Sequence, residues 1–284
     1  MRGILSGAFL LQALRISVPY VLAALGGVAS ERSGVINIAL EGMLLVGAFG
    51  AAVGALASGS ALAGLGAGVL AGVALAALYG LAVIRWRADQ IVCGVAATLL
   101  ALGATRYFLK VFYNSTSNSP RIPSTDGLGW AILVGAALLA ALAEAGLRRT
   151  AIGLRLRAVG EHPEAARSVG VRVAPLRWLG VLLSGALAGL GGVWLAFDQH
   201  GFVANMSAGR GFIALAAMIL GGWRPLGALG ACLLFGGAEA LQLRLQSSGM
   251  GLGAGTVQAL PYLITIVALA VRGRASVAPR ALGT

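Results

Sequence analysis

A few polar side chains interrupt an otherwise apolar chain, and they are the residues best able to do chemistry in it. Glu31 and Glu41 bracket a polar stretch that contains Asn37, and Glu239 lies near the end of a later apolar run. Ionisable groups inside a membrane are costly and usually mark a functional pathway. One interpretation is that Asn37, Glu41 and Glu239 line or brace a polar route for a solute. The alternatives are that Glu31 pairs with Arg32 or a nearby arginine to hold a re-entrant turn, and that Glu239 simply reaches the membrane interface.

Catalysis and metal binding have no support in the sequence. A P-loop needs a lysine that reaches the phosphates of ATP, and the only lysine of the chain, Lys110, stands among apolar residues. His162 and His200 are too far apart in sequence to form a metal-ligand motif. Cys93 and Cys232 lie in apolar runs, as small core residues do. We therefore expect no enzyme activity, no catalytic residue, no metal and no cofactor bound by this chain.

The composition predicts a membrane protein. Hydrophobic residues make up 58% of the 284 residues, charged residues only 11%, and the mean hydropathy is +0.90. A soluble domain carries roughly a quarter charged residues. The long uncharged runs predict an all-α, polytopic transmembrane helical bundle of about 8–9 spans, with one or two short or broken helices and a possible inverted repeat. We expect a single transmembrane domain over residues 1–284, multi-pass in the cell inner (plasma) membrane.

The apolar runs and the polar loops between them divide the chain into spans. An interfacial helix is expected over residues 3–14, and the apolar piece at 211–222 is too short to cross comfortably. The loop from Asp198 to Arg210 is expected outside. The predicted spans cover residues 16–30, 42–57, 61–84, 91–108, 128–147, 176–197, 226–244 and 257–271.

The net charge of +12 comes from arginines in the loops between these spans. Such residues collect on the cytoplasmic side, so the loop at 148–177 and the tail at 272–284 are both expected in the cytoplasm. The charge is spread over several loops, which predicts contact with membrane lipid and no nucleic acid. Counting spans back from the tail places the N-terminus outside, although Arg2 and Arg15 argue against that.

The basic loop at 148–177 contains a candidate short helix. Proline favours the first position of a helix, an early acid and a late base suit the helix dipole, and glycine closes a helix in the left-handed conformation. A helix of about two turns is not stable alone, so it must dock, either on a partner protein or on the chain's own spans. The residues expected to couple the chain to such a partner are Glu161, Pro163, Glu164, Ala165, Ala166, Arg167 and Gly170.

Small residues and an internal echo suggest how the spans pack. The chain has 44 glycines, and G-x-x-x-G spacings occur at 50/54, 64/68/72 and 185/189. Such spacings let helices approach closely, either within the chain or at a dimer face. Residues 38–47 align with residues 213–222 at six of ten positions. This match is either chance in an Ala/Leu/Gly-rich chain or an inverted repeat, the arrangement that builds transporter pathways around interrupted helices.

Three segments, at 26–49, 157–173 and 209–242, make the chain similar to a known family. It resembles the permease subunit of a bacterial ABC importer, of the group that handles branched-chain amino acids, ribose-type sugars and nucleosides. The nucleoside/simple-sugar branch is the closest match, and the resemblance covers about residues 16–271. The signature E-R-x-G-x-x-N-x-x-x-E-G of that branch falls here on Glu31, Arg32, Gly34, Asn37, Glu41 and Gly42.

The resemblance implies an assembly of several proteins. A second permease subunit pairs with the chain as a hetero- or homodimer, an ABC ATPase uses the ATP, and an extracytoplasmic solute-binding protein delivers the solute. Relatives carry a coupling helix in the loop that here contains Glu161 to Gly170. Nucleosides are the leading solutes, followed by simple sugars. The competing interpretations are a self-sufficient secondary transporter or facilitator, which would need more buried ionisable groups for ion coupling, and a structural membrane scaffold.

Overall fold

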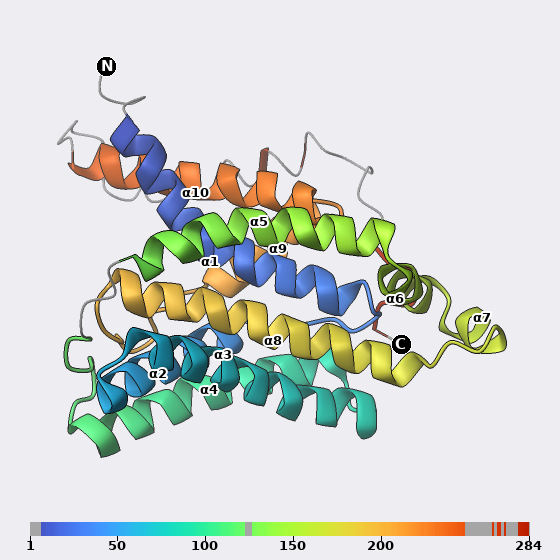
Figure 1. Cartoon of the computed structure of the whole chain (residues 1–284), viewed down its shortest axis with the longest axis horizontal. Coiled ribbons are helices and arrows are strands. Elements are labelled where there is room, and N and C mark those ends of the chain that lie inside the picture. The colour runs from blue at the N-terminus through green and yellow to red at the C-terminus, as the bar shows by residue number, and fades with distance from the viewer. Residues whose placement is uncertain are drawn as a thin grey trace.

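The computed structural model describes residues 7–122, 127–247, 263, 266–267, 270 and 278–283, and these residues are mostly helical. Seven helices within these described residues are long and apolar enough to cross a membrane. Their axes run roughly side by side in an elongated bundle (Figure 1). The elements are α1 (Gly7–Glu31), α2 (Leu40–Ser58), α3 (Ala61–Gly80), the π-helical turn η1 (Leu81–Arg85), α4 (Gln90–Tyr113), α5 (Leu128–Arg149), α6 (Ala151–Glu161), α7 (Pro163–Ser168), α8 (Val173–Asp198), α9 (Arg210–Leu220) and α10 (Pro225–Ser247).

The N-terminal part is one helix and not two. We expected an interfacial helix at 3–14 and a span at 16–30, but α1 runs without a break from Gly7 to Glu31. The helix carries the charge of Arg15 within it. That charge is paired, because Arg15 lies 2.6 Å from Asp198 at the end of α8. The span predicted at 257–271 lies outside the described residues.

Three helices pack backbone to backbone at the centre of the bundle. A Cβ atom added to Gly47 in α2 would lie 2.6 Å from the Cα of Gly189 in α8. One added to Gly189 would lie 3.0 Å from the carbonyl oxygen of Gly68 in α3. Close helix contact in a membrane requires such small residues. The G-x-x-x-G glycines at 50, 54, 64, 68, 72, 185 and 189 all approach other helices of the same chain.

Two interruptions break the bundle. After α1 the chain makes a non-helical turn, with Gly34 at φ +93°, before α2 begins at Leu40. After α8 it makes a second one that ends at Gly209, φ +84°, where α9 begins. With 11 residues, α9 is about 16 Å long, which is too short to cross a bilayer.

The two ends of the bundle differ. Helices α6 and α7 and the described residues of the tail lie together at one end (Figure 1). The tail is held there by backbone hydrogen bonds from Ala281 to Gly160 and from Gly283 to Gly34. At the opposite end the loop after α4 pairs with the loop after α8, where the amide of Ser119 donates to the carbonyl of Phe202 at 2.8 Å.

Candidate functional site

The carboxylate of Glu41 holds the first turn of α9. Its Oε1 accepts a hydrogen bond from the amide of Gly209 at 2.8 Å, and its Oε2 accepts one from the amide of Gly211 at 2.6 Å. Glu41 is only 4% exposed and lies in the first turn of α2. The first amides of a helix have no partner within the helix, and the positive end of the helix dipole favours an anion. Glu41 therefore joins the starts of the two helices that follow the interruptions.

Asn37 lies in the first interruption and is fully buried. Its amide nitrogen donates to the hydroxyl of Ser184 in α8, while its Oδ1 has no hydrogen-bond partner among the described residues. The backbone beside it is satisfied by side chains, because the amide of Ile36 donates to Gln90 at 2.7 Å and the hydroxyl of Tyr79 donates to the carbonyl of Ile36. The turn is thus fixed by α3, α4 and α8.

Glu239 forms the third predicted polar position, and it does more than reach the interface. Its Oε2 accepts a hydrogen bond from the hydroxyl of Tyr20 in α1, and its Oε1 lies 3.6 Å from the guanidinium of Arg210. The side chains of Arg210 and Glu239 are 22% and 25% exposed. Arg210 was expected in an external loop, but it is the first residue of α9. The bundle interior therefore contains an acid–base pair with partial access to solvent.

A cavity of about 460 Å³ has Arg210 of this pair in its wall. Gln12 and Arg15 of α1, Leu243 of α10 and Gln199 after α8 contribute to its walls together with Arg210. It lies between α1, α8 and α10 and extends from the α9 start toward the end of the bundle where α8 finishes. The cavity therefore combines polar side chains with apolar ones such as Leu11, Ile16 and Leu195.

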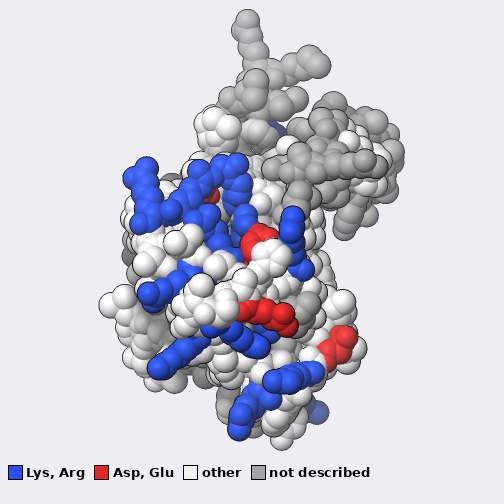
Figure 2. All heavy atoms as spheres, turned by 90° about the vertical axis from the view of Figure 1, so that its right-hand side faces the viewer, with Lys and Arg blue, Asp and Glu red and all other residues white. Residues whose placement is uncertain are grey.

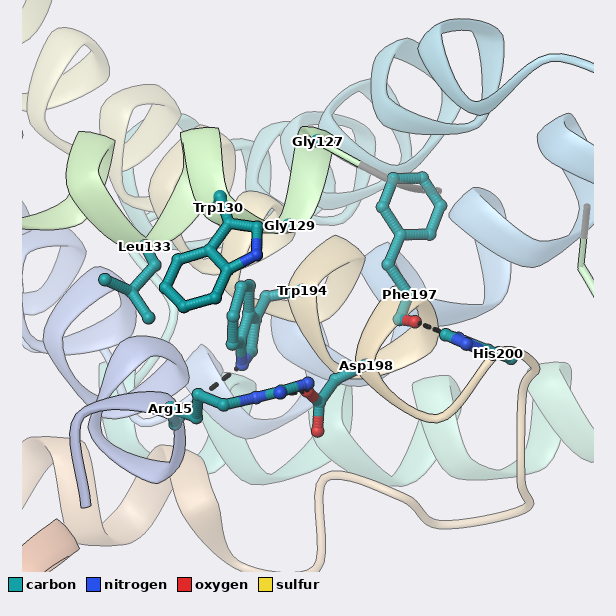
Figure 3. A pocket seen from close by; sticks show the side chains of 9 residues that line it. All are labelled: Arg15, Gly127, Gly129, Trp130, Leu133, Trp194, Phe197, Asp198 and His200. Atoms are coloured by element: carbon teal, nitrogen blue, oxygen red, sulfur yellow. Dashed lines mark hydrogen bonds and ion pairs between the residues drawn. The ribbon is translucent and has the colours of Figure 1, made fainter. Parts of the chain in front are cut away.

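A second cavity, of about 280 Å³, lies at the same end between α1, α5 and α8. Figure 3 shows Trp130, Trp194, Arg15 and Asp198 turned toward it from these helices. The indole N–H of Trp194 donates to the carbonyl of Arg15 at 3.1 Å, and the Arg15–Asp198 ion pair closes one side. His200 bonds to the carbonyl of Phe197 at 2.7 Å. The cavity therefore combines aromatic faces with one charged pair.

Glu31 and Arg32 do not form the pair that the sequence suggested as an alternative. The carboxylate of Glu31 accepts a hydrogen bond from the indole N–H of Trp223 at 2.6 Å. Arg32 donates to the carbonyl of Trp223 at 2.8 Å and lies 3.8 Å from Glu161 of α6. Both residues therefore fasten the first interruption to the turn between α9 and α10. Trp223 lies about 190 positions from Glu31 and Arg32 in the sequence, so no local pattern predicts these contacts.

The loop at 148–177 contains two helices where one was expected. The candidate helix from Glu161 to Gly170 is divided: Glu161 ends α6, and α7 spans Pro163–Ser168. Ala166 is buried against Val159 and Val173, so one face of α7 packs on its own chain. The opposite face of α7 is exposed and includes the charged side chains of Glu164 and Arg167 together with Ala165. Gly170 follows the helix at φ +84°.

Helix α7 lies beyond the ends of the long helices and is the outermost element at its end of the bundle (Figure 1). Figure 2, which faces this end, shows Lys and Arg side chains over much of the surface and few Asp and Glu. No group of His, Cys, Asp or Glu in the described part of the chain is arranged to hold a metal ion. This end is therefore a basic surface with one short projecting helix.

Seven apolar spans, two interruptions and a buried polar cluster beside a cavity define a polytopic membrane transport protein. The chain belongs to the family described as "Branched-chain amino acid transport system / permease component", which it matches over residues 9–269. It is accordingly a permease subunit of the ABC transporter class, a multi-pass protein of the inner membrane, and not an enzyme.

Its relatives include several permeases of ABC transporters. It is 40% identical to the guanosine ABC transporter permease NupQ of Bacillus subtilis, with 94% of this chain and 92% of the relative aligned. It is 36% identical to the nucleoside ABC transporter permease NupC of Lactococcus lactis, with the same shares aligned. It is 36% identical to a putative glucose ABC transporter permease of Haloferax volcanii, over 88% of this chain and 86% of that protein.

Proposed function

We propose that this chain is one of two permease subunits of a nucleoside importer, in which ATP hydrolysis by a separate ATPase drives transport. The observation that carries the proposal is the polar cluster of Glu41, Arg210 and Glu239, placed where two interrupted helices meet and beside a cavity. Two of the relatives are named for guanosine or nucleosides. Simple sugars are the second candidate, because a third relative is named for glucose.

In this proposal the solute passes the start of α9. Arg210 and Glu239 are partly exposed and offer both donors and acceptors to hydroxyl and amide groups of a solute, whereas the fully buried Asn37 holds the first interruption in place. Glu41 braces α9 from behind and is too buried to meet the solute. Two chains are expected to form the whole pathway, as a hetero- or homodimer. An extracytoplasmic solute-binding protein delivers the solute.

The coupling step is assigned to α7. The basic end of the bundle is placed in the cytoplasm, because positive residues collect there and because the arginine-rich loop and the tail share it. An ATPase subunit can bind the projecting helix through the exposed side chains of Glu164 and Arg167. Gly170, with its positive φ, lets the chain turn back into α8. The ATP is bound by that partner and not by this chain.

The span count and the repeat belong to the same proposal. With a further span at 257–271 the chain has eight full spans, and the shorter α9 is a ninth membrane segment. In this proposal the further span returns the chain to the end of the bundle where the tail lies. Residues 38–47 run into α2, which begins at Leu40, and residues 213–222 run from the first turns of α9 past its end at Leu220. A glycine with positive φ precedes each segment, Gly34 in one case and Gly209 in the other. One interruption follows the basic end and the other follows the opposite end, as an inverted repeat requires. The N-terminus is then outside, with Arg15 neutralised by Asp198.

The experiment uses proteoliposomes that contain the complete transporter, with the solute-binding protein outside and ATP inside. Uptake of labelled guanosine and of labelled glucose is measured together with ATP hydrolysis. Glu164→Lys and Gly170→Leu are expected to abolish uptake while the protein stays folded and hydrolysis continues. Lys110→Glu, a charge reversal at the opposite end of the bundle, is the matched control and should transport normally.

Unchanged uptake in both α7 variants would contradict the coupling role. Uptake by the permease alone, driven only by an ion gradient, would support a self-sufficient secondary transporter instead. Equal uptake of guanosine and glucose would contradict the assignment of nucleosides as the solute.

A further inference from the structure

A pocket rich in arginine lies at the basic end of the bundle, at the junction of α5, α6 and the turn before α10. It has a volume of about 440 Å³. We call it the arginine pocket. Its charged lining residues are Arg32, Arg148, Arg157, Arg224 and Glu144. It lies at the opposite end of the bundle from the cavity beside α9 and shares no lining residue with it.

The positive charge of the arginine pocket is only partly balanced. Arg148 pairs with Glu144, and Arg32 donates to the carbonyl of Trp223. The Nε of Arg157 is buried and has no hydrogen-bond partner among the described residues. Arg224 is exposed and makes no ion pair within the described part of the chain. A buried donor without a partner is costly, so the pocket favours an anion that accepts several hydrogen bonds.

The position of the pocket indicates where such an anion comes from. The spans formed by α5 and α10 have their ends there, at Arg149 and Pro225, and lipid headgroups lie around the ends of membrane spans. The surfaces of the same two helices continue from the pocket into the membrane as exposed apolar side chains, with Leu142 56% and Leu226 50% exposed. A headgroup in the pocket therefore has apolar helix surface beside it for its acyl chains.

We propose that the arginine pocket binds the phosphate of an anionic phospholipid from the cytoplasmic leaflet. A guanidinium group can give two parallel hydrogen bonds to phosphate oxygens, and Arg157 and Arg224 have donors to give. Basic pockets between spans at the cytoplasmic side bind anionic headgroups in this way. A zwitterionic lipid is disfavoured, because its ammonium group adds positive charge to a pocket that already has an excess.

The test is native mass spectrometry of the purified chain with bound lipid. Phosphatidylglycerol, phosphatidylcholine and inorganic phosphate are titrated separately. The double variant Arg157→Gln/Arg224→Gln removes the two arginines with free donors. Arg155→Gln/Arg172→Gln makes the same change in charge at two exposed residues outside the pocket. Circular dichroism and gel filtration check the fold, and Arg224→Gln alone serves if the double variant does not fold.

We expect phosphatidylglycerol to bind the wild type and the control variant alike, and to bind the pocket variant at least about tenfold more weakly, the equivalent of one lost charged hydrogen bond. Equal loss in both double variants would overturn the proposal, since it would show diffuse attraction. Equal binding of phosphatidylcholine would do the same. Tight binding of inorganic phosphate without preference for the lipid would assign the pocket to a soluble anion. Complete displacement of the lipid by the ATPase subunit would assign it to protein docking.

Discussion

Replacing Glu41 tests whether the start of α9 depends on a side chain from α2. Glu41→Gln keeps the size of the side chain but leaves one acceptor oxygen where the carboxylate has two. The new NH2 group would face the amide of Gly209 or of Gly211, which are bonded at 2.8 and 2.6 Å. A hydrogen bond to a charged group contributes about 1.5–3 kcal/mol. A charge at a helix end adds about 0.3–1 kcal/mol, and up to about 2 when partly buried.

The sum predicts a loss of about 2–4 kcal/mol in the free energy of unfolding. In a chain of 284 residues that lowers the melting temperature by about 3–7 °C, which thermal unfolding in detergent can measure. Asp198→Asn is the control, because Asp198 is also bonded at 2.6 Å but in an ion pair whose side chains are 47% and 34% exposed. Exposed pairs contribute about 1 kcal/mol or less.

Gly211→Ala attacks the same contact from the side of α9. A Cβ atom there would lie 2.5 Å from the Cα of Glu41, so the two helix starts must separate. Since either change breaks one shared contact, the double variant Glu41→Gln/Gly211→Ala should lose little more than the worse single variant. A melting temperature of Glu41→Gln equal to that of the wild type, or fully additive losses in the double variant, would refute the reasoning.

Two further changes test the packing and the turn before α10. Gly47→Ala should destabilise the bundle by about 1–3 kcal/mol, because its Cβ would lie 2.6 Å from the Cα of Gly189. Gly66→Ala is the control: it has open space around it and should unfold at or above the wild-type temperature. Trp223→Phe removes the indole N–H that donates to the carboxylate of Glu31 at 2.6 Å and should cost about 1.5–3 kcal/mol; a double-mutant cycle with Glu31→Gln should return a coupling energy of at least about 0.5 kcal/mol, and a value of zero would contradict the contact.

The long helices could be predicted because hydropathy is a local property. The spans expected at 42–57, 128–147 and 226–244 differ from α2, α5 and α10 by a few residues at each end. The two interruptions after α1 and α8 could also be predicted, because each contains a glycine within a polar stretch, Gly34 or Gly209. The family resemblance rested on the residues in and around these breaks, and the comparisons confirm it.

What the sequence could not provide were the partners of the charged residues. Glu41 and Gly209 are 168 positions apart, and Arg15 and Asp198 are 183 apart. No local pattern pairs them, and the charge of Arg15, taken without its partner, argues against an N-terminus outside. Helix α6 was missed for a related reason. Arg155 and Arg157 gave its segment the appearance of a charged loop, whereas Leu156 and Val159 are buried and form its inner face.

The position of the acid at 41 follows from the length of α9. A helix of 11 residues that ends at the turn before α10 begins inside the bundle, where the amide of Gly211 is buried and would cost several kcal/mol if it were left unsatisfied. The break is tolerated only if protein groups replace water. Glu41 offers two acceptor oxygens, and the amides and dipole of α9 in turn lower the cost of burying its charge. Each half of the contact is unfavourable alone and acceptable with the other. In this chain the acidic side chain of Glu41 therefore supplies the acceptors that the interrupted start of α9 needs.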